Sequence, residues 1–448
     1  MNNKIKLAVA GAVFATSAAN AGIIIPAGDW TLDINGNVNA YATWVDADKT
    51  KGTAPGGGLA VTRDVTGEDQ SQNINTGLLP AWLGFTGTTR QNDVDVSFTI
   101  SFQPNVSDNH PMGDVLTPLN RQAFVTFGDK SWGTIKAGKD LGVFAGQAIL
   151  NDMTLLGVGA AFANSGTQTS LGGIGTGYIY PAWKGQIAYT TPNMNGFSAT
   201  IAITNPNQGG FGAATTTTTT SGAVSGAGSI TSGSNLGYST TVTGATELYQ
   251  DRFGVEAQVM YEWTGDVAGK VWASGATYDV TVGTGSNTTT TNSTHDSFTA
   301  SVYDLGANVN VGNLGLTGYY YNGEGVGTTF MGGFAATGAD VGYDIQNNKA
   351  KKRDSDGGYL QATYVIPTGT KLGVAYGVSR LDEASGETNA TMIDKNERWT
   401  VGAYHPLTKH LNLVAEYNKI ESEGQVSSNQ TESILLYSAT KFKCLVNG

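Results

Sequence analysis

The stretch from Trp30 to Trp44, WTLDINGNVNAYATW, alternates strictly between two classes of residue. Every even-numbered position is apolar or glycine, and the odd-numbered positions carry polar residues or tyrosine. A period of two predicts a β-strand, because successive side chains of a strand point to opposite faces. Such a strand would be about 46 Å long at about 3.3 Å per residue, and a tilt of ~45° would give it a rise of about 33 Å. That rise suits the apolar band of an outer-membrane barrel with its aromatic girdles, although a long strand of a secreted β-sandwich would show the same pattern.

Alternation and turn residues along the rest of the chain predict sixteen strands in all. Their ranges are 30–45, 78–88, 93–103, 120–128, 132–139, 177–190, 196–204, 252–263, 267–282, 296–311, 313–322, 357–367, 370–381, 396–405, 410–421 and 431–442.

The connections between these strands alternate between short and long without exception. The long ones are 46–77, 104–119, 140–176, 205–251, 283–295, 323–356, 382–395 and 422–430. An up-and-down barrel in an outer membrane has this arrangement, with tight periplasmic turns, longer external loops and an even number of strands. A Greek-key sandwich does not alternate so regularly. The sequence therefore predicts an all-β fold, a sixteen-stranded antiparallel transmembrane β-barrel.

The start of the chain has the features of an exported protein. Two lysines precede an apolar run, and Ala19-Asn20-Ala21 is a cleavage signal, so residues 1–21 are predicted to be a signal peptide and residues 22–448 a single barrel domain. Cys444 is the only cysteine, and therefore disulfides do not hold the protein together. The 62 glycines and the modest hydrophobic fraction of 40% suit a barrel whose wet interior needs no large dry core.

Charge and motifs argue against several other classes of protein. The net charge of −11 argues against nucleic-acid binding. The four histidines have no zinc-site spacing, and the chain has neither a nucleophile elbow nor a phosphate-binding loop. We therefore expect no enzymatic activity, no cofactor and no bound metal.

Four segments resemble successive hairpins of the Gram-negative general porins. They are AWLGFTGTTRQNDVDVSFTISFQ (81–103), RQAFVTFGDKSWGTIKAGKD (121–140), YTTPNMNGFSATIAI (189–203) and WTVGAYHPLTKHLNLVAEYNK (399–419). The resemblance implies an outer-membrane location with contacts to lipid and lipopolysaccharide, and a homotrimer inserted by the barrel-assembly machinery. It also implies that the third external loop folds into the lumen and narrows it.

The third long connection, 140–176, is rich in apolar residues for a solvated loop. Packing against the inner wall of the barrel would require such residues, and so would a contact between subunits. Two features depart from the family pattern. Gly138-Lys139-Asp140 stands where the family commonly has Gly-Arg-Gln, and residues 443–448 form an atypical tail after Phe442, where the family normally ends on an aromatic residue.

Candidate pore residues follow from the same alternation, because polar positions between lipid-facing residues point into the lumen. Opposed charges across a narrow passage would discriminate solutes by charge, although any one of them could be a solvated charge at the rim. The alternation places the side chains of four cations inward: Lys136, Lys184, Arg252 and Arg398. Asp140 and Asp152 lie on the third long connection. The resemblance adds Arg121 and Lys139 to the basic residues of the passage. The predicted constriction residues are Lys136, Lys139, Arg121, Lys184, Arg252, Arg398, Asp140 and Asp152.

The function that this sequence predicts is a water-filled channel for the passive diffusion of small hydrophilic solutes and ions. Two alternatives stay open at this point. One is an adhesion or binding barrel that acts through its long external loops, which include the Thr/Gly-rich segments in 205–251 and 283–295. The other is a soluble, secreted β protein.

Overall fold

The structure is a computed structural model. It describes residues 23–63, 66–104, 119–160, 169–205, 215–219, 239–243, 245–247, 252–284, 294–331, 341–347, 349–389, 392–426 and 428–442. The predicted signal peptide and the C-terminal tail, 443–448, lie outside the described residues.

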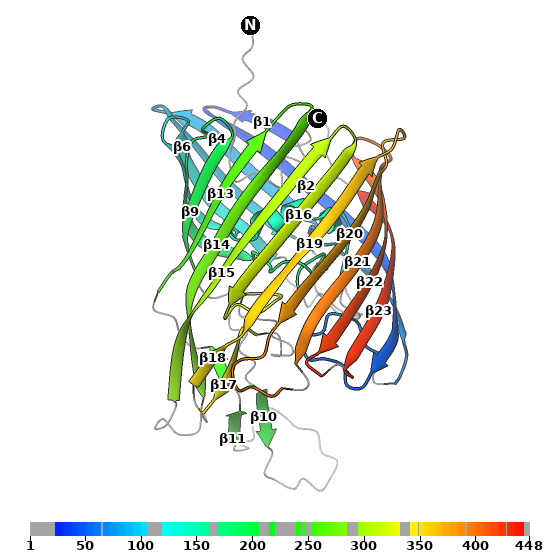
Figure 1. The fold of residues 1–448 in the computed structure, drawn as a ribbon. Coiled ribbons are helices and arrows are strands. Elements are labelled where there is room, and N and C mark those ends of the chain that lie inside the picture. The colour runs from blue at the N-terminus through cyan, green and yellow to red at the C-terminus, as the bar shows by residue number, and fades with distance from the viewer. Residues whose placement is uncertain are drawn as a thin grey trace, which may run out of the picture.

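Sixteen antiparallel strands close into a barrel (Figure 1), as the alternation of the sequence predicts. Each strand pairs with the next along the chain, and the last pairs with the first between Val38–Lys51 and Gln430–Phe442, so the wall has no free edge. The strands are β2 (Trp30–Lys51), β4 (Trp82–Gln91), β5 (Val94–Gln103), β6 (Leu119–Asp129), β7 (Gly133–Leu141), β8 (Trp183–Thr190), β9 (Phe197–Thr204), β13 (Gly254–Trp263), β14 (Val267–Thr284), β15 (Thr294–Val311), β16 (Leu314–Glu324), β19 (Asp354–Val365), β20 (Lys371–Leu381), β21 (Ile393–Pro406), β22 (Leu411–Gly424) and β23 (Gln430–Phe442).

Short elements accompany the barrel. Strands β1 (Ile23–Ala27), β3 (Gln70–Asn75) and β12 (Ala245–Glu247) pair with barrel strands. Two hairpins, β10 (Thr215–Thr219) with β11 (Ser239–Thr243) and β17 (Tyr343–Gln346) with β18 (Lys349–Lys352), lie at the end of the barrel that carries the long loops (Figure 1). Helix α2 (Gly146–Asn151) and the 3-10 turn η1 (Met153–Leu156) lie inside the barrel. Within the described ranges, neither helix has the length or apolar character to cross a membrane.

The two faces of β2 differ as the alternation predicts. The even-numbered side chains point outward, and Val38 and Trp44 are 46% and 42% exposed. Asn37 and Asn39 point inward and are only 2% and 1% exposed, because their side-chain amides donate to the carbonyls of Pro80 and Leu79. The even-numbered apolar residues of this strand therefore face outward, and its odd-numbered residues face the interior; these are mostly polar, but include the buried Tyr41, Val45 and Ala47.

The short turns fix the register of neighbouring strands. Between β4 and β5 only Asn92 and Asp93 form the turn, and both have positive φ, at 49° and 63°. A two-residue hairpin turn with both residues in the left-handed region matches the twist of the sheet, and asparagine and aspartate tolerate it well. Strand β4 therefore continues to Gln91, beyond the end at residue 88 that the alternation predicts.

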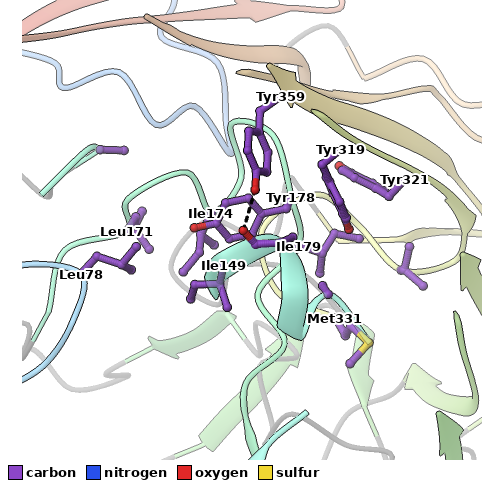
Figure 2. Close-up of a cluster of buried hydrophobic side chains, with 14 of the residues drawn as sticks. Leu78, Ile149, Leu171, Ile174, Tyr178, Ile179, Tyr319, Tyr321, Met331 and Tyr359 are labelled. Carbon is purple, nitrogen blue, oxygen red and sulfur yellow. Dashed lines mark hydrogen bonds between the residues drawn. The ribbon is translucent and has the colours of Figure 1, made fainter. Parts of the chain in front are cut away.

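The interior also holds a hydrophobic cluster that composition alone did not predict (Figure 2). Leu78, Ile174, Tyr178 and Ile179 are buried there with other loop residues and with tyrosines of β16 and β19. Residues 78–81 and 177–182 were expected to belong to strands, but they are loop segments packed inside the barrel. The sequence pattern cannot distinguish an apolar strand residue that faces lipid from an apolar loop residue that packs inside the barrel, because both are kept from water.

Candidate functional site

A long loop between β7 and β8 lies within the barrel over its described residues, 142–160 and 169–182, which are here called the inner loop (Figure 1). It contains α2 and η1 and crosses the lumen on the inner side of the wall. Its described residues contact strands from β13 around to β2, and many of its side chains are fully buried. The contacts between this loop and the wall fix its position inside the barrel.

The loop is anchored first by Glu256 of β13. One carboxylate oxygen of Glu256 accepts hydrogen bonds from the backbone N–H groups of Val143 and Phe144, at 2.7 and 2.9 Å. The other oxygen lies 2.5 Å from the Lys184 ammonium, and both side chains are buried. A buried carboxylate with three charge-assisted donors fixes the start of the loop against the wall.

Two further wall carboxylates hold later parts of the loop in the same way. Asp304 of β15 accepts from the Ala145 N–H at 3.2 Å. Glu416 of β22 accepts from the N–H groups of Val158 and Gly159, each at 3.0 Å, and from the Tyr404 hydroxyl at 2.6 Å. The wall thus satisfies loop N–H groups that would otherwise be buried without a partner.

Tyrosine hydroxyls bind carbonyls of the same loop. Tyr359 of β19 donates to the Ala148 carbonyl at the α2 helix, and Tyr41 of β2 donates to the Leu156 carbonyl, both at 2.8 Å. In Figure 2, Tyr359 and Tyr319 flank Tyr178 of the inner loop. The C-terminal part of the inner loop, which contains Tyr178, therefore packs against tyrosines of β16 and β19.

The predicted charges Lys136 and Asp140 form an ion pair within β7, with Nζ 2.5 Å from a carboxylate oxygen. The Asp140 carboxylate also accepts from the Gln122 amide at 3.2 Å. Both residues point into the barrel and line a cavity between β7 and the inner loop, together with Gln147 and Leu150 of α2. The ion pair therefore borders the space between β7 and α2.

Arg398 and Asp152 are also brought together, but as a support for the loop. Asp152 is the N-cap of η1, and its carboxylate accepts from the Thr154 N–H, the Gly173 N–H and the Tyr178 hydroxyl, each at 2.9 Å. The Arg398 guanidinium lies 3.8 Å from the same carboxylate, and both side chains are buried. Like Lys184, Arg398 points inward, as its parity predicts, and it pairs with Asp152 of the inner loop, so the two charges are neutralised within the loop contact.

The structure places the remaining three predicted residues elsewhere. Lys139 is exposed, shares a strand face with Ala137, and donates to the Asn120 carbonyl. Arg252 lies just before β13 with a largely exposed side chain and pairs with Asp279 at 3.1 Å. Arg121 sits at a β-bulge between β5 and β6, where the alternation of inward and outward side chains is interrupted.

Uncharged residues cover the inner face of β4, β5 and β6 over most of its length. The hydroxyls of Thr86 and Thr99 lie 3.1 Å apart, and Ser101 donates to Gln122 at 3.1 Å. Toward the short turns this wall opens into a cavity of about 680 Å³, where Arg90 lies among acids at the rim. The basic face that the family resemblance implies is therefore weak on these strands.

The anchoring acids Glu256, Asp304 and Glu416 were not singled out from the sequence. Each lies at an inward position between outward apolar neighbours, and that is the available signal. Nothing in the sequence tells which inward acid meets the loop, because that depends on the path of the loop across the lumen. No group of metal-ligating residues occurs in the part of the chain that the structure describes.

Comparisons with known proteins agree with this architecture. The family model described as Gram-negative porin matches residues 7–329. Among solved structures, the chain is similar to the outer membrane channel DcaP of Acinetobacter baumannii, with 16% identity and a TM-score of 0.62. It is also similar to OmpF of Salmonella typhi, solved in complex with daunomycin, with 14% identity and a TM-score of 0.55. Both alignments cover 94% of this chain and 100% of the other. Comparison with curated proteins gives no match.

Proposed function

Because the chain belongs to the Gram-negative porin family, and is thus an outer-membrane channel protein, we propose that it lets small hydrophilic solutes and ions diffuse passively through a water-filled lumen. The observation that carries the proposal is the opposite character of the two faces of one closed wall. Val38 and Trp44 face outward from β2, whereas Asn37 and Asn39 of the same strand face inward. A wall of this kind separates lipid from a hydrated passage.

The inner loop makes the passage selective by size. Hydrogen bonds from β13, β15, β19 and β22 hold the loop against this side of the wall. Solutes then pass beside α2, along the cavity lined by Lys136 and Asp140. A rigidly held loop gives a constant opening, as a molecular sieve requires.

A homotrimer is part of the proposal. OmpT of Vibrio cholerae, whose in-vitro folded structure is described as a trimer form, matches this chain with a TM-score of 0.50. The outward apolar surface of the short strands β8 and β9 offers Ile187 and Ile201 for lipid or for a neighbouring subunit.

Planar-bilayer recording tests the proposed function. We expect stable ion currents that appear in steps of three equal conductances when the refolded protein inserts. A protein that inserts and folds, as judged by its β-sheet circular dichroism, but carries no current would contradict the proposal.

Two charge reversals test the lumen assignment of the predicted lysines. Lys136→Glu places an acid beside Asp140 in the cavity and should shift the permeability ratio toward cations. Lys139→Glu makes the same change of charge at an exposed residue on the other strand face and should shift the ratio less. Reversal potentials in a salt gradient measure both, and an equal or larger shift for Lys139→Glu would contradict the assignment.

A further inference from the structure

Three lysines lie on the inner wall near the end of the barrel that carries the short turns. Lys136 is the fourth residue of β7, Lys270 is the fourth residue of β14, and Lys371 is the first residue of β20. Around the closed barrel, four strand pairings separate β7 from β14, and four more separate β14 from β20. The three ammonium groups are thus distributed around the lumen rather than gathered at one point.

Lys270 and Lys371 belong to the inward face of their strands. Lys270 has the parity of the buried Trp272, whereas Val271 between them is exposed on the outer face. Lys371 has the parity of the buried Ala375, whereas Leu372 is exposed on the outer face. Both lysines nevertheless keep partial exposure, which at inward positions means exposure to the lumen.

Aromatic rings of the wall fix all three ammonium groups. Lys136 Nζ lies 5.3 Å from the ring centre of Phe124, and Lys270 Nζ lies 6.0 Å from that of Trp272. Lys371 Nζ lies 5.0 Å from the ring centre of Tyr404. Cation–π contacts of this kind hold a lysine in place without cancelling its charge.

Lys270 and Lys371 differ from the other inward cations in having no ion-pair partner among the described residues. Lys136, Lys184 and Arg398 each have an acid within ion-pair distance. Lys270 instead donates to the neutral Gln147 side chain of α2 at 2.9 Å, and within the described residues neither Lys270 nor Lys371 has an ion pair.

The acids nearest to these two lysines act on them from a longer range. Glu262 stands opposite Lys270 in the register of β13 and β14. Glu416 is the acid that acts on Lys371, and its carboxylate is already occupied by loop N–H groups and by the Tyr404 hydroxyl. The lumen beside the inner loop therefore presents two fixed cations that, among the described residues, have no acid within ion-pair distance.

We propose that Lys270 and Lys371 make this pore favour anions, including chloride and small carboxylates, although the chain as a whole carries a net charge of −11. The proposal rests on the proposed channel function and names the residues that set its charge preference. Unpaired cations in a passage with low-dielectric walls raise the local concentration of anions. Acids that are paired or that bind the loop contribute little to this field.

The chloride-to-potassium permeability ratio, measured from the reversal potential of single channels in a potassium chloride gradient, tests the proposal. We expect a ratio above one for the wild-type protein and a ratio about threefold lower for Lys270→Gln with Lys371→Gln. Glu262→Gln should raise the ratio, because it removes the acid opposite Lys270. Lys409→Gln removes a lysine from an exposed short turn outside the lumen wall, and the ratio should stay unchanged.

The outcomes separate this inference from the function on which it rests. Folded wild-type protein without current would overturn the channel function and the inference together. Open channels that favour potassium in the wild type, or an unchanged ratio in the double variant, would overturn the inference alone. If the double variant does not fold, the Glu262→Gln channel still decides, because a ratio equal to or below that of the wild type contradicts the proposal.

Discussion

Replacing Glu256 with alanine is expected to lower the free energy of unfolding of the barrel by about 3–5 kcal/mol. The substitution leaves the Lys184 ammonium, whose side chain is 3% exposed, buried without its partner. It also removes the acceptor of the Val143 and Phe144 N–H groups, so the inner loop loses its first anchor. Urea titrations of the protein in lipid vesicles, followed by tryptophan fluorescence, measure the change.

A paired substitution is the control for this prediction. Glu256→Leu with Lys184→Met removes both charges together and should recover most of the lost stability, because neither charge is left buried alone. The two N–H groups of the loop still lack an acceptor in that variant, so a smaller loss of about 1–3 kcal/mol should remain. A single Glu256→Ala variant as stable as the wild type would show that the ion pair does not hold the loop.

Replacing Ile201 with arginine is the second prediction with a large effect. Ile201 lies in the interior of β9 on the outer face and is 55% exposed. An arginine at this position meets the hydrocarbon of the bilayer or the apolar face of a neighbouring subunit, and either should lower the free energy of unfolding by about 2–4 kcal/mol. The same urea titration in vesicles measures the loss.

The neighbouring residue supplies a matched control. Thr200 lies on the inner face of β9, where its hydroxyl is 2.9 Å from that of Thr190 and borders the cavity beside the inner loop. Thr200→Arg introduces the same side chain into water and should cost about 1 kcal/mol or less. Equal losses at the two positions would contradict the assignment of lipid and water to the two faces.

The strands could be predicted from the sequence because one physical rule governs them all. A wall with lipid outside and water inside requires a period of two along each strand. The outward position of Val38 and the inward position of Asn39 can therefore be predicted from their order in the sequence. The closed ladder and the alternation of short and long connections then fix the number of strands and their order. Boundaries differ chiefly where apolar loop residues such as Leu78 and Tyr178 extend a strand pattern into the interior.

The candidate site could be predicted only in part. Parity correctly turned Lys184 and Arg398 inward, but it could not show that Glu256 and Asp152 neutralise them. The Arg398–Asp152 pair depends on the route of the inner loop across the lumen. The Lys184–Glu256 pair joins β8 and β13, which flank β9 in the wall and lie 72 residues apart at this contact. Lys270 and Lys371 could not be distinguished from the other inward cations in the sequence, because only the structure shows which cations have an acid within ion-pair distance.

Thiol modification of single channels tests the central claim most directly, namely that the inner face of the wall lines a water-filled passage and the outer face meets lipid. Cysteine is introduced at Thr200 or at Ile201 in a Cys444→Ser background, and a membrane-impermeant methanethiosulfonate reagent is added to open channels. We predict that modification lowers the current stepwise in Thr200→Cys and leaves it unchanged in Ile201→Cys. A current that falls in Ile201→Cys and stays constant in Thr200→Cys would contradict the account.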